Sequence, residues 1–288
     1  MNSFTSINTG GIDWLARWRE LYDAERAQGE AATDPTFRRQ SDCWSGRAER
    51  FAATSRRIEQ PDAFMQRLAP RLRPTDRVLD VGAGTGRYVP FLAQHVAEVI
   101  AVEPSPAMRI ELELTLAREQ VTNVQVCPEN WPLREPIQAE VVLSAHVVYG
   151  VREIGPFLAA LDAAATRLCV LFLGLKHPTA VLAPFWERVH SEPRLPLPAA
   201  LETLAACHQL GLPANLELVP AVRPFRFAGV EEALEELQIR LRLGPDPQRE
   251  AVLREAIADL LVMTPEGMLA PRNAPSHAAV IWWTPTSR

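Results

Sequence analysis

The central part of the chain alternates between short apolar runs and segments in which apolar residues recur every three or four positions. The apolar runs predict buried strands, at 78–81, 97–105, 121–126, 139–149 and 167–175. The segments between them predict helices, after Tyr88 and over 105–120 and 154–166. A β-α-β-α-β alternation of this kind predicts parallel strands with right-handed crossover connections.

Before this region, the chain shows helical rather than strand periodicity. Asp13 is placed to cap a helix that carries Trp14, Trp18 and Tyr22 on one stripe. That stripe indicates either packing or a lid over a substrate. A polar stretch at 29–42 predicts a loop, and amphipathic segments at 43–52 and 61–72 predict two further helices. We expect residues 1–72 to form an N-terminal helical cap or lid segment.

After residue 175 the pattern is longer than a minimal α/β domain requires. Helical spacing predicts helices at 183–190, 201–210, 230–243 and 248–263, and apolar runs predict strands at 215–220 and 277–283. We therefore expect the main α/β domain to occupy 73–288, with substrate-binding elements inserted at about 176–265.

Composition narrows the classes of protein that this chain represents. A net charge of −5 without a basic track does not favour a nucleic-acid partner. No apolar stretch reaches the length of a membrane span, and the first residues lack a secretory pattern, so we expect a cytoplasmic protein without membrane attachment. The four cysteines are widely spaced, which predicts neither a disulfide framework nor a zinc site.

The most informative stretch follows the first strand. Asp80 precedes three glycines at alternate positions, Gly82, Gly84 and Gly86, and a helix follows. Glycine lets a backbone turn sharply and approach a bound molecule, so this strand, loop and helix predict a nucleotide-type ligand site. A dinucleotide fingerprint would need glycine where the chain has Arg87.

The stretch from Val78 to Gly86 resembles motif I of the class I S-adenosylmethionine-dependent methyltransferases. The resemblance implies a Rossmann-like, seven-stranded, mostly parallel sheet with helices on both faces and an antiparallel last strand between the fifth and sixth. It also implies S-adenosyl-L-methionine as cofactor and S-adenosyl-L-homocysteine as product. Glu103 strengthens this interpretation, because it ends the next strand 23 residues after Asp80, where an acid meets a ribose.

The resemblance implies further cofactor contacts. In the glycine loop they are Asp80, Val81, Gly82, Ala83, Gly84 and Gly86, and beyond it Glu103, Pro104, Met108, Glu129, Asn130, Trp131, Ser144 and Trp44. Met108 would pack on the adenine or simply in the core. Cys127 stands where the family usually has an acid that contacts the adenine, and Glu129 is the candidate substitute.

His146 and Tyr149 are the candidate catalytic residues. Both follow the fourth strand, and ligands of open α/β sheets bind beyond the carboxyl ends of the strands. A histidine is suited to accept a proton near neutral pH. The alternative is that His146 only closes the pocket. No cluster of His, Asp or Glu has metal-ligand spacing, so no metal is expected.

These observations predict S-adenosylmethionine-dependent methyl transfer to an oxygen, nitrogen or carbon nucleophile of a small molecule. Two alternatives stay open: a non-catalytic, cofactor-binding protein with the methyltransferase fold, and a nicotinamide-dependent oxidoreductase, which Arg87 disfavours. The sequence does not determine the acceptor or the oligomeric state.

Overall fold

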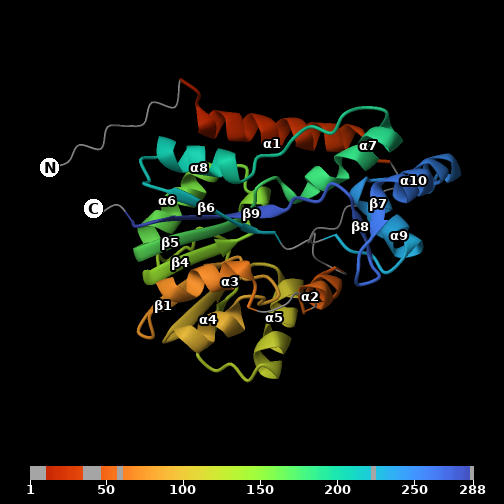
Figure 1. Ribbon diagram of the computed structural model, residues 1–288. Helices are drawn as coiled ribbons and strands as arrows, with labels where there is room; N and C mark the ends of the chain where they lie inside the picture. Colours follow the sequence, from red (N-terminus) through yellow and green to blue (C-terminus); the bar gives the residue numbers. More distant parts are fainter. Residues whose placement is uncertain (1–10, 35–46, 57–60, 222–224, 286–288) are drawn as a thin grey trace.

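The structure is a computed structural model that describes residues 11–34, 47–56, 61–221 and 225–285 (Figure 1). Trp44, a predicted cofactor contact, lies outside these residues. Among the helices of the described ranges, none combines the length and the apolar character needed to cross a membrane.

A seven-stranded sheet forms the centre of the molecule (Figure 1). Its strands are β1 (Arg77–Val81), β2 (Glu98–Val102), β3 (Val124–Cys127), β4 (Ala139–Ala145), β5 (Ala165–Gly174), β6 (Asn215–Pro220) and β9 (His277–Trp283). They are ordered β3-β2-β1-β4-β5-β9-β6, and β9 runs antiparallel to both β5 and β6. The expected sheet, with an antiparallel last strand between the fifth and sixth, is confirmed.

Helices cover both faces of this sheet (Figure 1). On one face lie α1 (Trp14–Ala31), α6 (Ile154–Ala164) and α8 (Ala200–Gln209); on the other lie α3 (Ala63–Leu68), α4 (Val89–His95) and α5 (Pro106–Arg118). α2 (Ala48–Arg56) packs against α5. Short 3₁₀ turns occur at Ala69–Arg71, Val148–Gly150 and Pro178–Leu182.

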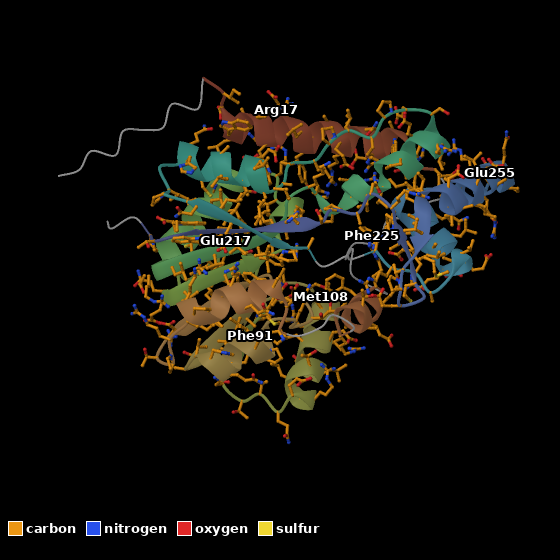
Figure 2. The ribbon with its side chains drawn as sticks, viewed as in Figure 1. Arg17, Phe91, Met108, Glu217, Phe225 and Glu255 are labelled. Atoms are coloured by element: carbon orange, nitrogen blue, oxygen red, sulfur yellow. The ribbon has the colours of Figure 1, made fainter. Side chains whose placement is uncertain are left out.

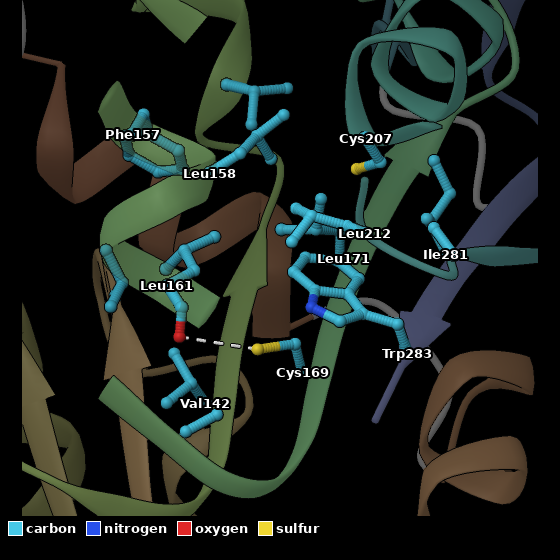
Figure 3. Close-up of a cluster of buried hydrophobic side chains, with 14 of the residues drawn as sticks. Val142, Phe157, Leu158, Leu161, Cys169, Leu171, Cys207, Leu212, Ile281 and Trp283 are labelled. Atoms are coloured by element: carbon cyan, nitrogen blue, oxygen red, sulfur yellow. Dashed lines mark hydrogen bonds between the residues drawn. The ribbon is translucent and has the colours of Figure 1, made fainter. Parts of the chain in front are cut away.

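The core beneath α6 and α8 holds two buried thiols (Figure 3). Cys169 donates its Sγ hydrogen to the Leu161 carbonyl at 3.3 Å, and burial raises the pKa of both Cys169 and Cys207, that of Cys207 to about 12. Trp283 donates its indole N–H to Asp162 at 2.9 Å within the same cluster. These thiols therefore remain protonated core groups and are not nucleophiles.

The first helix is part of the core. Asp13 caps it by accepting from the backbone N–H groups of Leu15 and Ala16 at 3.1 and 3.0 Å, as the sequence predicts. The helix continues to Ala31, so the predicted loop begins later than residue 29, because residues 29–31 still complete helical turns. Trp18 is fully buried and donates its indole N–H to the Val151 carbonyl at 2.8 Å. This supports packing for Trp18.

The residues after β5 build a second, smaller core. It joins α7 (Ala183–His190), α9 (Val230–Arg240), α10 (Pro247–Leu260) and the hairpin of β7 (Leu261–Met263) and β8 (Leu269–Pro271). The predicted helix at 248–263 is wrong at its end, because residues 261–263 pair with β8 around a turn at Gly267. A strand of only three residues is too short to show an alternating pattern, and it forms because a later strand pairs with it.

Two strand boundaries also differ from the predictions. The third strand begins at Val124, because the Val121 N–H still bonds to the Leu116 carbonyl and completes the end of α5. The fourth strand ends at Ala145, because His146 adopts a φ of +60° and turns the chain out of the sheet.

Candidate functional site

The glycine loop wraps over the carboxyl end of the neighbouring strand. The N–H groups of Gly82 and Ala83 both donate to the Val102 carbonyl, at 2.8 and 3.0 Å. Gly82, Gly84 and Gly86 have φ angles of +79°, +60° and +81°, a region that residues with a Cβ rarely adopt. The sequence expectation of a sharp turn after β1 is therefore confirmed.

The three glycines serve different purposes. A Cβ at Gly82 would lie 2.4 Å from Cγ2 of Val147, and one at Gly86 would lie 2.6 Å from Cδ1 of Leu112. A Cβ at Gly84 would meet no atom within 4 Å. Gly82 and Gly86 thus permit close packing within the protein, whereas Gly84 borders space that none of the described residues fills.

Glu103 lies directly beside this loop. Its Oε2 accepts the Gly84 N–H and its Oε1 accepts the Ser105 N–H, both at 2.8 Å. The Glu103 N–H bonds to the Cys127 carbonyl at 3.0 Å, which brings the ends of β2 and β3 together. The carboxylate is only 6% exposed, so its position is well defined relative to the loop.

Asp80 lies in β1, just before the loop, and is 2% exposed. Burial raises the pKa of its carboxyl group to about 7, and the nearby charge of Glu103 contributes in the same direction. A cation placed beside Asp80 would stabilise its ionised form. Two acids therefore lie beside the loop, and the protonation of Asp80 changes near neutrality.

The predicted adenine contacts occupy the ends of β2 and β3. Met108 is buried at the end of α5 nearest the sheet (Figure 2). Glu129 accepts the Arg134 N–H at 3.3 Å, and Trp131 donates its indole N–H to the Phe157 carbonyl at 3.4 Å. Asn130 is exposed. Met108 thus lies in the first turn of α5, shortly after Glu103 at the end of β2. Trp131 is instead held against α6.

Two other predicted contacts have partners within the protein. Ser144 donates its hydroxyl hydrogen to the Val81 carbonyl at 3.0 Å and so joins β4 to β1. Pro104 accepts a hydrogen bond from Arg109 through its carbonyl at 2.7 Å. Both residues lie near the loop, and their hydrogen bonds stabilise its surroundings.

His146 and Tyr149 lie together, as predicted from their position after β4. Nδ1 of His146 is 3.3 Å from the Tyr149 hydroxyl, which accepts the Gly174 N–H at 2.5 Å. The imidazole contacts Phe172 edge-on at 4.8 Å, and the Tyr149 ring contacts His177 edge-on at 4.8 Å. The backbone φ of +60° at His146 lies in the left-handed region, which few residues other than glycine adopt.

The surroundings make His146 a weaker base than ordinary histidine. Desolvation by the neighbouring groups lowers its pKa to about 4, and the Arg87 guanidinium adds to this effect. The residue is exposed at one edge, and water there moderates the shift. Burial raises the pKa of the Tyr149 hydroxyl above its ordinary value, so the phenol stays protonated.

Sequence reasoning missed a second group of residues behind the loop. Arg87 pairs with Asp62, which caps α3, and its guanidinium lies 4.9 Å over the ring of Tyr88. Tyr88 in turn packs against Phe64 and Phe172. These residues come from separate segments of the chain, so the sequence does not show that they meet.

An open groove of about 880 Å³ lies behind the loop, between α2 and α3 on one side and α4 and α5 on the other. Thr85, Gly86 and Arg87 are among its described lining residues, but Asp80, Glu103 and His146 are not. The groove is therefore separate from the side of the loop that carries the two acids. No group of three or more His, Cys, Asp and Glu residues within the described ranges is arranged to hold a metal ion.

Residues 53–170 match the model of a methyltransferase domain family. The chain is 35% identical over 78 residues to protein-L-isoaspartate O-methyltransferase 1 of Polaromonas sp., a match that covers 26% of this chain and 33% of that protein. A match to the corresponding Gloeobacter violaceus enzyme covers 47% of that protein at the same identity. The chain thus spans between a third and a half of the length of these curated relatives.

Solved structures resemble the chain over more of its length. The YcgJ protein of Bacillus subtilis superposes with a TM-score of 0.52 at 14% identity, covering 78% of this chain and 98% of that one. The BH2331 protein of Bacillus halodurans superposes with a TM-score of 0.53 at 12% identity, again covering 78% of this chain and 98% of that one. At these identities the likeness establishes the fold. Residues 53–170 are therefore similar to a methyltransferase domain, and the chain shares the fold of these solved structures.

Proposed function

We propose that this protein transfers a methyl group from S-adenosylmethionine to a nucleophilic atom of a small molecule. The observation that carries the proposal is the geometry of Glu103, whose carboxylate lies at the carboxyl end of β2 and bonds the Gly84 N–H at 2.8 Å. The methyltransferase-domain match over 53–170 supports the same function.

The described residues suit this cofactor. Gly84 borders open space, as a loop that receives a ligand requires, and Glu103 is placed to accept hydrogen bonds from the two ribose hydroxyls. Asp80 offers a carboxyl group for the ammonium at the amino-acid end, and Met108 an apolar surface for the adenine. When bound, S-adenosylmethionine supplies an electrophilic methyl group on sulfur.

His146 is our candidate for the general base. It follows β4 directly, where an acceptor would meet the methyl group, and its low pKa keeps the ring neutral and able to accept a proton. Tyr149 is better suited to position the ring than to accept a proton, since its own pKa is raised. Its hydroxyl is fixed by the Gly174 N–H and lies 3.3 Å from Nδ1 of His146.

The tautomer of His146 decides whether its ring can act as a general base. Tyr149 accepts one hydrogen bond from Gly174. If it accepts a second from Nδ1–H of His146, the lone pair of Nε2 is available for the acceptor's proton. Holding two reacting groups in a near-attack arrangement supplies most of the remaining rate enhancement for an in-line displacement.

The acceptor class rests on the elements after β5. The small core around Phe185 and Trp186 includes Val181 and Leu182, which follow His177, and the His177 ring contacts Tyr149. By their names, the curated relatives act on an amino-acid residue of proteins. We favour a small molecule because these additional elements lie outside the region that matches the methyltransferase-domain model.

Two measurements test the function. Isothermal titration with S-adenosylhomocysteine is expected to give one site per chain, and isotope-labelled methyl from S-adenosylmethionine is expected to enter low-molecular-weight material of a cell extract. Label in protein alone would contradict the acceptor class. Binding without any transfer would instead support the alternative of a non-catalytic, cofactor-binding protein.

A further inference from the structure

The groove behind the glycine loop has a volume of about 880 Å³ and lies between α2 and α3 on one side and α4 and α5 on the other. This volume is within the range of sites that hold small molecules. Asp80, Glu103 and His146 are not among its described lining residues. Neither the cofactor nor the methyl acceptor assigned above therefore accounts for this groove.

Two buried hydroxyl groups line the groove. Ser55 on α2 is 7% exposed and Thr85 in the glycine loop is 4% exposed. Neither hydroxyl bonds to a residue that the structure describes, and neither oxygen is cut off from solvent. Thr115 donates its hydroxyl hydrogen to the Thr85 carbonyl at 3.0 Å, which fixes the Thr85 backbone and leaves the Thr85 hydroxyl available. Because buried hydroxyls normally have partners, these two indicate a ligand with hydrogen-bonding atoms.

The charged side chains of the groove are mostly cationic. Those among its described lining residues are Arg56, Arg87, Arg118 and Glu119. Arg87 already pairs with Asp62, but Arg118 donates to Glu119 through Nε at 3.0 Å, which leaves its two terminal nitrogens available. Arg56 lies 3.8 Å from Glu111, beyond hydrogen-bond distance. A guanidinium binds oxyanions through several N–H groups, so this rim favours an anionic ligand.

Another part of the groove wall is apolar. Phe91 on α4 packs against His95 with their ring centroids 4.4 Å apart, and both residues line the groove together with Pro90 (Figure 2). Ala52 and Pro61 also line it. Such side chains pack on the carbon skeleton of a ligand, which an inorganic ion lacks. The groove therefore suits an organic molecule with an anionic end.

We propose that this groove binds a small organic oxyanion, a molecule that carries a phosphate-like group on an apolar body, at a site distinct from that of the cofactor. Arg56 and Arg118 bind the anionic group, the hydroxyls of Ser55 and Thr85 bond to oxygen atoms of the ligand, and Phe91 packs on its apolar body. The proposal goes beyond the proposed function, because it requires neither a methyl donor nor methyl transfer.

A matched pair of fluorescent probes tests the proposal. 8-Anilinonaphthalene-1-sulfonate has an apolar aromatic body with an anionic sulfonate, and N-phenyl-1-naphthylamine has the same body without the sulfonate. Fluorescence titration of the full chain should give one site per chain for the sulfonate and at least about tenfold weaker binding of the neutral probe, the effect of losing a hydrogen bond to a charged group. Equal affinity for both probes, or many weak sites, would overturn the proposal.

Three variants locate the bound probe. Arg118→Ala should weaken the sulfonate at least about tenfold and the neutral probe less than about twofold. Ser55→Ala should weaken the sulfonate about three- to tenfold without lowering the thermal midpoint of the ligand-free protein, because its hydroxyl has no partner there. Arg17→Ala is the matched control, since Arg17 is a similarly exposed arginine of α1 on the other face of the sheet; it should change neither probe.

The opposite results would contradict the proposal. Parent-like sulfonate binding in both Arg118→Ala and Ser55→Ala would place the probe elsewhere. A clear fall in the thermal midpoint of ligand-free Ser55→Ala would show that this hydroxyl holds the structure together and would overturn its role in binding.

Competition separates this site from the cofactor site. Saturating S-adenosylhomocysteine should leave one sulfonate probe bound per chain. Displacement of the probe would show that it occupies the cofactor site and would overturn the proposal. If the parent does not bind S-adenosylhomocysteine, the proposed function fails, while the two probes and the variants still decide whether the groove binds an organic oxyanion.

Discussion

Individual residues of the glycine loop separate packing from ligand recognition. Gly82 and Gly86 allow two elements to approach closely, whereas Gly84 borders open space. Asp80 and Glu103 hold buried carboxyl groups beside the loop, and burial raises the pKa of Asp80 to about 7. Each of these differences leads to a separate experiment.

Alanine at Gly82 and at Gly84 should affect different properties. Gly82→Ala would place a methyl group 2.4 Å from Val147 at a φ of +79°, so the free energy of unfolding should fall by about 2 kcal/mol or more. The methyl group of Gly84→Ala would contact none of the described residues, so the free energy of unfolding should fall by only about 1 kcal/mol. It would, however, occupy the space proposed for the ligand. Urea unfolding and titration with S-adenosylhomocysteine measure the two effects. Equal losses of stability would contradict this division.

The carboxyl group of Asp80 should make stability depend on pH near neutrality. Its pKa is raised from 3.8 to about 7, so the stabilisation by its protonated form is complete below 3.8 and lost as pH rises through 7. Between pH 5 and 8 the parent should lose roughly 2–3 kcal/mol more than Asp80→Asn, at about 1.4 kcal/mol per unit. Urea unfolding at several pH values tests this. Parallel curves for the two proteins would refute the assignment.

If His146 is the general base, the reaction should remain fast at unusually acidic pH. Because desolvation and Arg87 lower the pKa of the imidazole, its neutral form persists below pH 6, and kcat/KM should stay nearly constant down to about pH 5. His146→Asn should lower kcat about 100-fold with little change in the affinity for S-adenosylhomocysteine. A profile that falls with a midpoint near 6.5, or an unchanged kcat in the variant, would exclude this role.

At the scale of elements, the first helix belongs to the same core as the sheet. Trp18 is buried in the cluster that contains Leu79 and Trp283, and its indole bonds to the chain just after the 3₁₀ turn that carries Tyr149. The helix therefore holds the loop after β4 in place. α7, α9, α10 and the hairpin of β7 and β8 form a separate core, which we propose for acceptor binding.

Removing the Trp18 side chain should destabilise the whole domain. Trp18→Ala leaves a large cavity and an unpaired Val151 carbonyl, so the free energy of unfolding should fall by about 3–5 kcal/mol. Arg17→Ala removes an exposed side chain of the same helix and should change it by less than about 0.5 kcal/mol. Chemical denaturation compares the two. A small effect of Trp18→Ala would indicate a helix that opens as a lid.

At the scale of the molecule, the sequence predicts the sheet better than the site. Apolar runs and the glycine loop are local signals, so β1, β2 and their connection could be predicted, and family resemblance supplied the antiparallel position of β9. The hairpin of β7 and β8 was missed because each of its strands has only three residues, too few to show an alternating pattern. The burial of Tyr88 is equally invisible in the sequence, because it depends on Phe64 and Phe172 from two other elements.

The most direct test of the account is the affinity for S-adenosylhomocysteine of the parent, Glu103→Gln and Glu113→Gln. Glu103 contacts the glycine loop, whereas Glu113 is an exposed residue of α5. The account predicts one site in the parent, binding weakened about 10- to 100-fold in Glu103→Gln, and parent-like binding in Glu113→Gln. No binding to the parent, or equal affinity in all three proteins, would contradict it.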